Sequence, residues 1–199
     1  MGRALPAPRS CAGRLPAVLE QARRAAEIGP RLRQDFGFDL HVRFALSSGE
    51  VSAGNMGSGE KFQYTVLGDV VNEASRLEPA NKDYGTRIIV TERTRREAGE
   101  AVEARRLDKV VLAGKTHPVV LYELLGPAGS LSPERRRLVE AYEAGLEACW
   151  RRDWDGAEQA LRQALALDPS DRPSAVLLER VAGHRLAPPP PDWQGETAR

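Results

Sequence analysis

The helix predicted to begin at Asp69 carries the side chains with the clearest chemical potential in this sequence. Asn72 and Arg76 are four residues apart, so they project from one face of that helix. A guanidinium group presents a planar fork of donors that matches phosphate or carboxylate oxygens, and an amide both donates and accepts hydrogen bonds. The same spacing allows a simpler interpretation, in which Arg76 only pairs with Glu73 or Asp69. From spacing alone, both interpretations stay open.

A glycine-rich segment and a strand must position this helix. Glycines are concentrated in residues 54–59, and Phe62 to Leu67 is typical of a strand. Gly68 and Asp69 then give the turn and the N-cap signal of a helix. The predicted order is strand, turn and helix.

Further elements are predicted on both sides of this unit. Helical spacing of apolar residues predicts a helix over Leu15–Ile28 that ends at Gly29 and Pro30. Alternation over Leu40–Leu46 predicts a half-buried strand, and Gly49 turns the chain into a second extended piece through Val51. Two strands in sequence predict a hairpin here.

The next segment continues the pattern. Residues 87–91 are rich in β-branched side chains, and Thr91 is expected to cap a short helix. Residues 107–112 and 119–124 flank a turn over Ala113–Thr116 and so predict a second hairpin. The alternation of strands and helices indicates an α+β fold.

The composition changes to a purely helical pattern near residue 127. Ser132 and Pro133 form an N-cap and first-turn pair for a helix to about Trp150, followed by a helix over residues 153–167 and a third through Val181. Small residues and a proline fall at the offsets of one tetratricopeptide repeat: Gly145, Ala157, Ala164 and Pro169. A single repeat must pack on the preceding domain or on a partner. For the proline-rich segment before Trp193 we expect a disordered end, the alternative being a docking motif.

Composition excludes several classes of protein. The 199 residues carry 29 Lys or Arg and 28 Asp or Glu, which argues against a nucleic-acid binder. No apolar run approaches the length of a membrane span. Cys11 and Cys149 lack zinc-site spacing, so no metal site is expected from them. The basic first 19 residues are interpreted as a loose terminus, with a targeting segment as the alternative.

Four motifs occur in one order: GNxGS, YTVxGDxVNxASRLE, NKxYGTRI and GKxxPVxxYEL. Together they resemble a class III adenylate or guanylate cyclase catalytic domain over residues 4–125. The resemblance implies a partial ferredoxin-like domain over residues 1–126, with an antiparallel sheet and flanking helices. A small all-α, tetratricopeptide-like extension over residues 127–187, as in bacterial sensor-linked adenylate cyclases, and a proline-rich tail over residues 188–199 would follow.

The resemblance also implies roles for individual residues. Asn72 matches the asparagine that positions the ribose, and Arg76 matches the arginine that stabilises the phosphates as charge builds in the transition state. Thr65 falls where the family recognises the purine and favours adenine, and thus ATP. Lys115 matches a lysine that contacts the triphosphate, with an exposed turn lysine as the alternative.

The sequence departs from the family at the metal site. The family holds Mg²⁺ or Mn²⁺ with two aspartates that precede the helix beginning here at Leu15, and Asp35 and Asp39 follow that helix instead. No metal ligand is therefore assigned in this chain, and whether it is an enzyme stays open. Alone, it is expected not to cyclise ATP.

Three interpretations remain. The chain is the carboxy-terminal part of an adenylate cyclase, a non-catalytic cyclase-like regulatory module acting through its helical extension, or a half-site that completes a second cyclase domain by dimerisation. A cytoplasmic location is expected, with any membrane anchor upstream. Because the family's first strand would lie beside Leu40–Leu46, we also expect an unpaired apolar sheet edge there.

Overall fold

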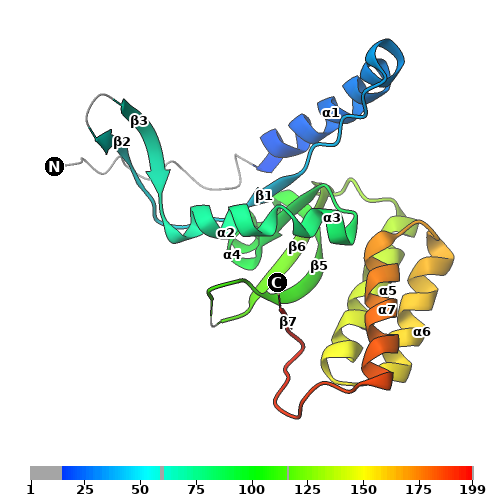
Figure 1. Ribbon diagram of the computed structural model, residues 1–199. Helices are drawn as coiled ribbons and strands as arrows, with labels where there is room; N and C mark the ends of the chain where they lie inside the picture. The colour runs from blue at the N-terminus through cyan, green and yellow to red at the C-terminus, as the bar shows by residue number, and fades with distance from the viewer. Residues whose placement is uncertain (1–14, 59–60, 116, 199) are drawn as a thin grey trace.

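A computed structural model describes residues 15–58, 61–115 and 117–198 of the chain. The described residues form one sheet with covering helices, a two-stranded arm and a three-helix segment (Figure 1). The helices are α1 (Leu15–Phe36), α2 (Asp69–Leu77), α3 (Ala80–Tyr84), α4 (Glu92–Ala98), α5 (Pro133–Trp150), α6 (Trp154–Leu167) and α7 (Arg172–Leu186). The strands are β1 (Phe44–Leu46), β2 (Ser52–Ser58), β3 (Lys61–Leu67), β4 (Ile88–Thr91), β5 (Val102–Val111), β6 (Val119–Pro127) and β7 (Thr197–Ala198).

The main sheet has the order β1-β4-β6-β5-β7. β4 pairs antiparallel with β6 and β6 with β5, while β1 and β7 are added in parallel at the two edges. The β5–β6 pair is the hairpin predicted around the Ala113–Thr116 turn, of which Thr116 lies outside the described residues. Sheet and helices together confirm the predicted α+β class.

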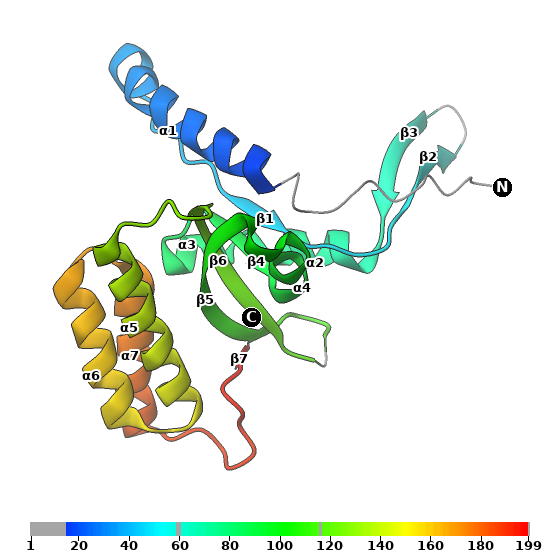
Figure 2. The same cartoon turned by 180° about the vertical axis from the view of Figure 1, so that it is seen from behind.

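The hairpin predicted between residues 40–46 and 49–51 is wrong. β1 is limited to Phe44–Leu46 and pairs in parallel with β4, with Phe44 opposite Ile88. β2 instead pairs with β3 to form the arm, which projects away from the sheet in both views (Figures 1 and 2). Alternation identifies a half-buried strand but not its partner, and here the apolar residues of β1 pack with β4 beneath α1. β1 is the sheet edge in the described part of the chain, as expected.

The predicted end of the first helix is also wrong, because α1 continues through Pro30 to Phe36. Proline removes one backbone donor from a helix, and this loss does not end a helix whose first turns are held against β1 and β4. Gly37 ends it instead. Its φ of 65° lies in the left-handed region, and its N–H donates to the carbonyl of Arg33 at 3.0 Å.

The three-helix segment shares a core with the sheet. One cluster of buried side chains joins α3 and β4–β6 to α5–α7 and includes Leu107, Leu121, Leu146 and Leu177. The segment thus packs on the preceding domain. The predicted cap holds as well, because the side chain of Ser132 accepts from Arg135 N at 3.2 Å.

The segment after α7 is docked, so the expected disordered end is wrong for the described residues up to 198. It runs from the end of α7 back to β5 (Figures 1 and 2). The ring of Trp193 lies against Trp154 and His184, with centroids 6.1 and 5.1 Å apart. Lys109 Nζ donates to the carbonyl of Gln194 at 2.9 Å. Aromatic contacts and hydrogen-bond donors from distant elements hold in place a segment for which composition alone predicts a disordered end.

Across the described ranges, no helix has both the length and the apolar character required to cross a membrane.

Candidate functional site

The turn between β3 and α2 places Gly68 in close packing against Glu50 and Val51. Gly68 occupies the N-cap position of α2, and a Cβ atom there would lie 3.0 Å from the carbonyl oxygen of Glu50 and 3.1 Å from Val51 Cγ1. A side chain would fit here only if Glu50 and Val51 shifted by a few tenths of an ångström, which favours glycine. The prediction that Asp69 caps the helix is wrong, because Asp69 is the first helical residue and α2 has no side-chain cap.

Arg76 reaches from α2 to the turn between β5 and β6. Its Nη1 donates a hydrogen bond to the carbonyl oxygen of Ala113, and a Cβ on Gly114 would stand 3.5 Å from the same nitrogen. The simpler interpretation of Arg76 as a partner of Glu73 or Asp69 is wrong, since Glu73 instead accepts a hydrogen bond from Ser47. The guanidinium group is thus committed to the turn and not to its own helix.

Lys115 approaches α2 from that same turn. Its ammonium group forms an ion pair with the carboxylate of Asp69, the lysine side chain being 26% exposed and the aspartate 74% exposed. Two cations far apart in sequence, Arg76 and Lys115, are therefore brought to one place by the packing of α2 against the β5–β6 turn.

The other two predicted residues differ in their surroundings. Asn72 is exposed one helical turn before Arg76, and its side chain makes no hydrogen bond within the described residues. Thr65 is half-buried in β3, opposite Gly54 on the arm. It precedes Gly68 by three residues, or about 10 Å of strand, and within the described ranges no hydrogen bond or ion pair joins its side chain to the other three. The structure groups Asn72, Arg76 and Lys115 around α2 and leaves Thr65 on the arm.

A cavity of about 730 Å³ opens beside Arg76. Asp83 from α3, Leu112 and Ala113 from the hairpin, and Thr197 from the docked tail contribute to its lining. Sequence reasoning missed Asp83 and Thr197. No motif could have placed Thr197 there, because its position depends on the pairing of β7 with Val110 and Val111.

The carboxylates around this site do not fit the two metal ions that the family resemblance implies. Asp69 is engaged by Lys115, and Glu73 is engaged by Ser47. Across residues 15–58, 61–115 and 117–198, no three His, Cys, Asp or Glu side chains lie close enough to hold a metal ion together. The groups that this site offers for chemistry are therefore the cations Arg76 and Lys115 and the amide of Asn72.

Comparisons with known proteins identify the family of this chain. The family described as the adenylate and guanylate cyclase catalytic domain matches residues 19–126. Adenylate cyclase 1 of Rhizobium meliloti is 34% identical over 110 residues, which cover 55% of this chain and 15% of that protein. The terminal-differentiation specific adenylate cyclase of Dictyostelium discoideum is 27% identical over 139 residues, 68% of this chain and 6% of that protein. This chain thus matches only a small part of each of these relatives.

A solved structure shows the same fold. The adenylyl cyclase CyaB from P. aeruginosa superimposes with a TM-score of 0.53 at 20% identity, over 61% of this chain and 62% of that one. The family match covers more than half of the chain and includes α2, the arm and the β5–β6 hairpin with Lys115. This chain belongs to the family of adenylate and guanylate cyclase catalytic domains.

Proposed function

We propose that this chain supplies the nucleotide-binding and charge-stabilising half of an adenylate cyclase site, which converts ATP to cyclic AMP and pyrophosphate. The observation that carries the proposal is the meeting of Arg76 and Lys115 at one hairpin turn. Cations gathered at one point suit a triphosphate, whose charge grows on the leaving pyrophosphate.

Each side chain has a distinct task in this proposal. The guanidinium fork of Arg76 binds phosphate oxygens and stabilises the transition state after exchanging the Ala113 carbonyl for a phosphate oxygen. Lys115 leaves Asp69 and contacts the triphosphate as a point charge. The amide of Asn72, which is exposed and without a hydrogen bond in the described part of the chain, orients the ribose. Thr65 contacts the adenine from the arm.

The proposal assigns the metal ligands to a second cyclase domain. When bound, Mg²⁺ or Mn²⁺ would activate the attacking hydroxyl group and neutralise the negative charge of the leaving group. Exposed apolar side chains along the arm and the start of α2 provide a surface for that partner. They are Val51 (48% exposed), Tyr64 (63%), Val66 (40%), Leu67 (56%) and Val71 (38%).

Complementation tests this function. Residues 1–199 alone should form no cyclic AMP above background with ATP and either metal ion. Activity should appear when the chain is mixed with a cyclase domain that keeps its metal-binding aspartates but lacks its own asparagine and arginine. The matched control is the Asn72→Ala/Arg76→Ala double variant, which should not rescue. Absence of rescue over a wide range of concentrations, or robust turnover by the isolated chain, would contradict the proposal.

A second candidate is a non-catalytic, cyclase-like module that regulates a partner through a tetratricopeptide-like extension. Two observations favour it. A Cβ on Gly145 of α5 would stand 2.8 Å from Leu161 Cγ of α6, the close helix approach that such a repeat uses. Arg105 of β5 also forms a buried ion pair with Asp171 beside α7, at 2.9 Å, which fixes the helices on the sheet. In this case the Asn72 and Arg76 substitutions should leave partner binding unchanged, whereas exposed substitutions on α5–α7 should weaken it.

A further inference from the structure

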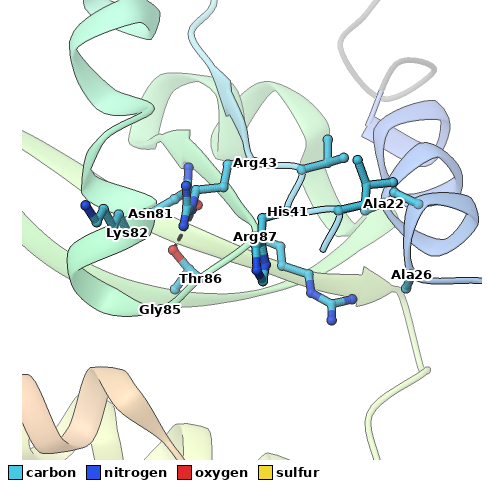
Figure 3. Close-up of a pocket in the computed structure, with 12 residues that line it drawn as sticks. Ala22, Ala26, His41, Arg43, Asn81, Lys82, Gly85, Thr86 and Arg87 are labelled. Atoms are coloured by element: carbon cyan, nitrogen blue, oxygen red, sulfur yellow. Dashed lines mark hydrogen bonds between the residues drawn. The ribbon is translucent and has the colours of Figure 1, made fainter. Parts of the chain in front are cut away.

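A second cavity lies away from the residues assigned above. It measures about 190 Å³ and opens between α1, the segment entering β1, and the α3–β4 connection (Figure 3). None of Asn72, Arg76, Thr65 and Lys115 belongs to its lining. The cavity is thus lined by other residues than those proposed for the cyclase reaction.

Basic side chains dominate the polar lining of this cavity. His41, Arg43, Lys82 and Arg87 contribute to it, and no acidic residue does. Within the described residues, the cationic side chains of Arg43, Lys82 and Arg87 form no ion pair and no hydrogen bond, and the imidazole of His41 forms no hydrogen bond. Like charges gathered without a counter-charge repel one another, and an anion between them would remove that repulsion.

A carboxylate close to His41, that of Asp39, is already engaged. Asp39 lies close enough to His41 for the imidazole to help lower the pKa of Asp39, but the main cause of that lowering is hydrogen bonding from Arg33. The two oxygens of Asp39 accept from Arg33 Nε and Nη2 at 2.6 and 2.8 Å. The carboxylate of Asp39 is therefore paired with Arg33 and not with the basic side chains that line the cavity.

A buried polar residue fixes one wall. Asn81 is fully buried, its Nδ2 donates to the carbonyl of Phe44 at 2.9 Å, and its Oδ1 accepts from Thr86 Oγ1 at 2.9 Å. These bonds join α3, β1 and the start of β4, and the Asn81–Thr86 bond is drawn in Figure 3. The amide of Asn81 is thus hydrogen-bonded within the protein, and its bonds fix the cavity wall that carries Arg43 and Arg87.

The side chains differ in where they point (Figure 3). Arg43 extends toward Asn81, Arg87 extends toward Ala26 of α1, and His41 lies between them, whereas Lys82 is directed away from the other three. Alanines at positions 22, 25 and 26 form the α1 wall and leave the space open. The cavity therefore presents two guanidinium groups and one imidazole to a ligand, with a lysine at its rim.

We propose that this cavity binds a small phosphate-bearing anion. Two guanidinium forks match the several oxygens and the multiple charge of a phosphate or diphosphate group better than a single carboxylate. The volume corresponds to about six water molecules, which accommodates one such group with part of its hydration. The ligand is either inorganic or the phosphate end of a small organic molecule.

Calorimetric titration of residues 1–199 at low ionic strength tests the proposal, with pyrophosphate, inorganic phosphate and AMP as three separate probes. Pyrophosphate should bind with a Kd that rises with added salt. Arg43→Gln and Arg87→Gln should each weaken that binding about tenfold or more, since each removes a charge-assisted bond. Lys82→Gln should weaken it less. Tight binding of AMP would identify an organic phosphate, and preference for pyrophosphate an inorganic one.

Arg96→Gln is the matched control, because Arg96 is an exposed arginine of α4 outside the cavity. It should leave the Kd unchanged. If Arg43→Gln does not give the circular dichroism spectrum of a folded protein, Arg87→Gln serves as the test variant instead, because the side chain of Arg87 is exposed. The proposal is overturned if no phosphate probe binds at millimolar concentration, if the cavity variants bind like the control, or if only an acidic peptide binds.

Discussion

The ammonium group of Lys115 is ion-paired with the carboxylate of Asp69, the first residue of the helix that also carries Arg76. Arg76 in turn donates to Ala113, two residues before Lys115. Both cations proposed to bind phosphate are therefore held by acceptors of this chain. A bound triphosphate has to replace an acceptor at each of them, so the two pairs set part of the apparent affinity for the substrate.

Asp69→Asn should lower the KM for ATP about two- to fivefold in the complemented assembly. The substitution frees Lys115 from an exposed ion pair, which is worth up to about 1 kcal/mol. Steady-state kinetics at fixed metal concentration measure the change, with Asp35→Asn on the exposed end of α1 as the charge control. In a Lys115→Ala background the effect of Asp69→Asn should vanish. A KM that falls equally in both backgrounds would show that Lys115 is not the mediator.

Arg76→Ala should lower kcat by about 10²- to 10³-fold in the same assembly, while KM changes less. This is the usual scale for removing one preorganised group that stabilises charge in the transition state. Arg96→Ala controls for the loss of an exposed arginine elsewhere. Glu73→Ala is a poor control, because Glu73 accepts a hydrogen bond from Ser47. Equal turnover numbers for the wild type and the Arg76 variant would contradict the assigned site.

Asp171→Ala should reduce the free energy of unfolding by about 3–5 kcal/mol. The substitution leaves the buried guanidinium group of Arg105 without this partner and removes the N-cap of α7, in which Asp171 accepts from Ser174 N at 3.1 Å. Urea unfolding measures the loss. Asp153→Ala removes the exposed N-cap of α6 alone and should lower stability by about 1 kcal/mol. Similar losses in the two variants would mean that the ion pair with Arg105 contributes little.

His184 should make stability fall as the pH drops below about 6.5. Burial, with smaller contributions from Arg180 and Arg152, lowers the pKa of His184 below its ordinary value, so the unfolded chain takes up the proton first. Neutral His184 makes its full contribution to the free energy of unfolding above the pKa that it has in the unfolded chain. This contribution is lost as the pH falls from 6.5 toward the pKa of His184 in the folded protein.

Urea midpoints between pH 8 and pH 5.5 measure this dependence, and tryptophan fluorescence reports whether Trp193 leaves its place beside His184. His184→Phe keeps an aromatic ring against Trp154 and Trp193 but cannot titrate. This variant should lose the decrease in stability below pH 6.5. Retention of the same decrease in His184→Phe would assign it to other groups.

Local patterns predicted much of the secondary structure. The caps Thr91 and Ser132 were predicted because a short hydroxyl side chain bonds backbone donors within its own turn. The β5–β6 hairpin was predicted because its turn and flanking strands are contiguous. Patterns of this kind do not identify the partner of β1, because that partner, β4, is distant in sequence. They also place the end of the first helix too early, at Pro30. The domain boundary near residue 127 and the roles of the four site residues stay predictions.

By itself, the sequence determined which residues share a helix face, such as Asn72 and Arg76, and the order of motifs that marks the family. Only the tertiary structure decided that Arg76 bonds Ala113, that Lys115 pairs with Asp69, and that Thr197 lines the cavity beside them. The reason is physical. A helix or strand face follows from a fixed period along the chain, whereas these contacts join residues tens of positions apart and depend on how whole elements pack.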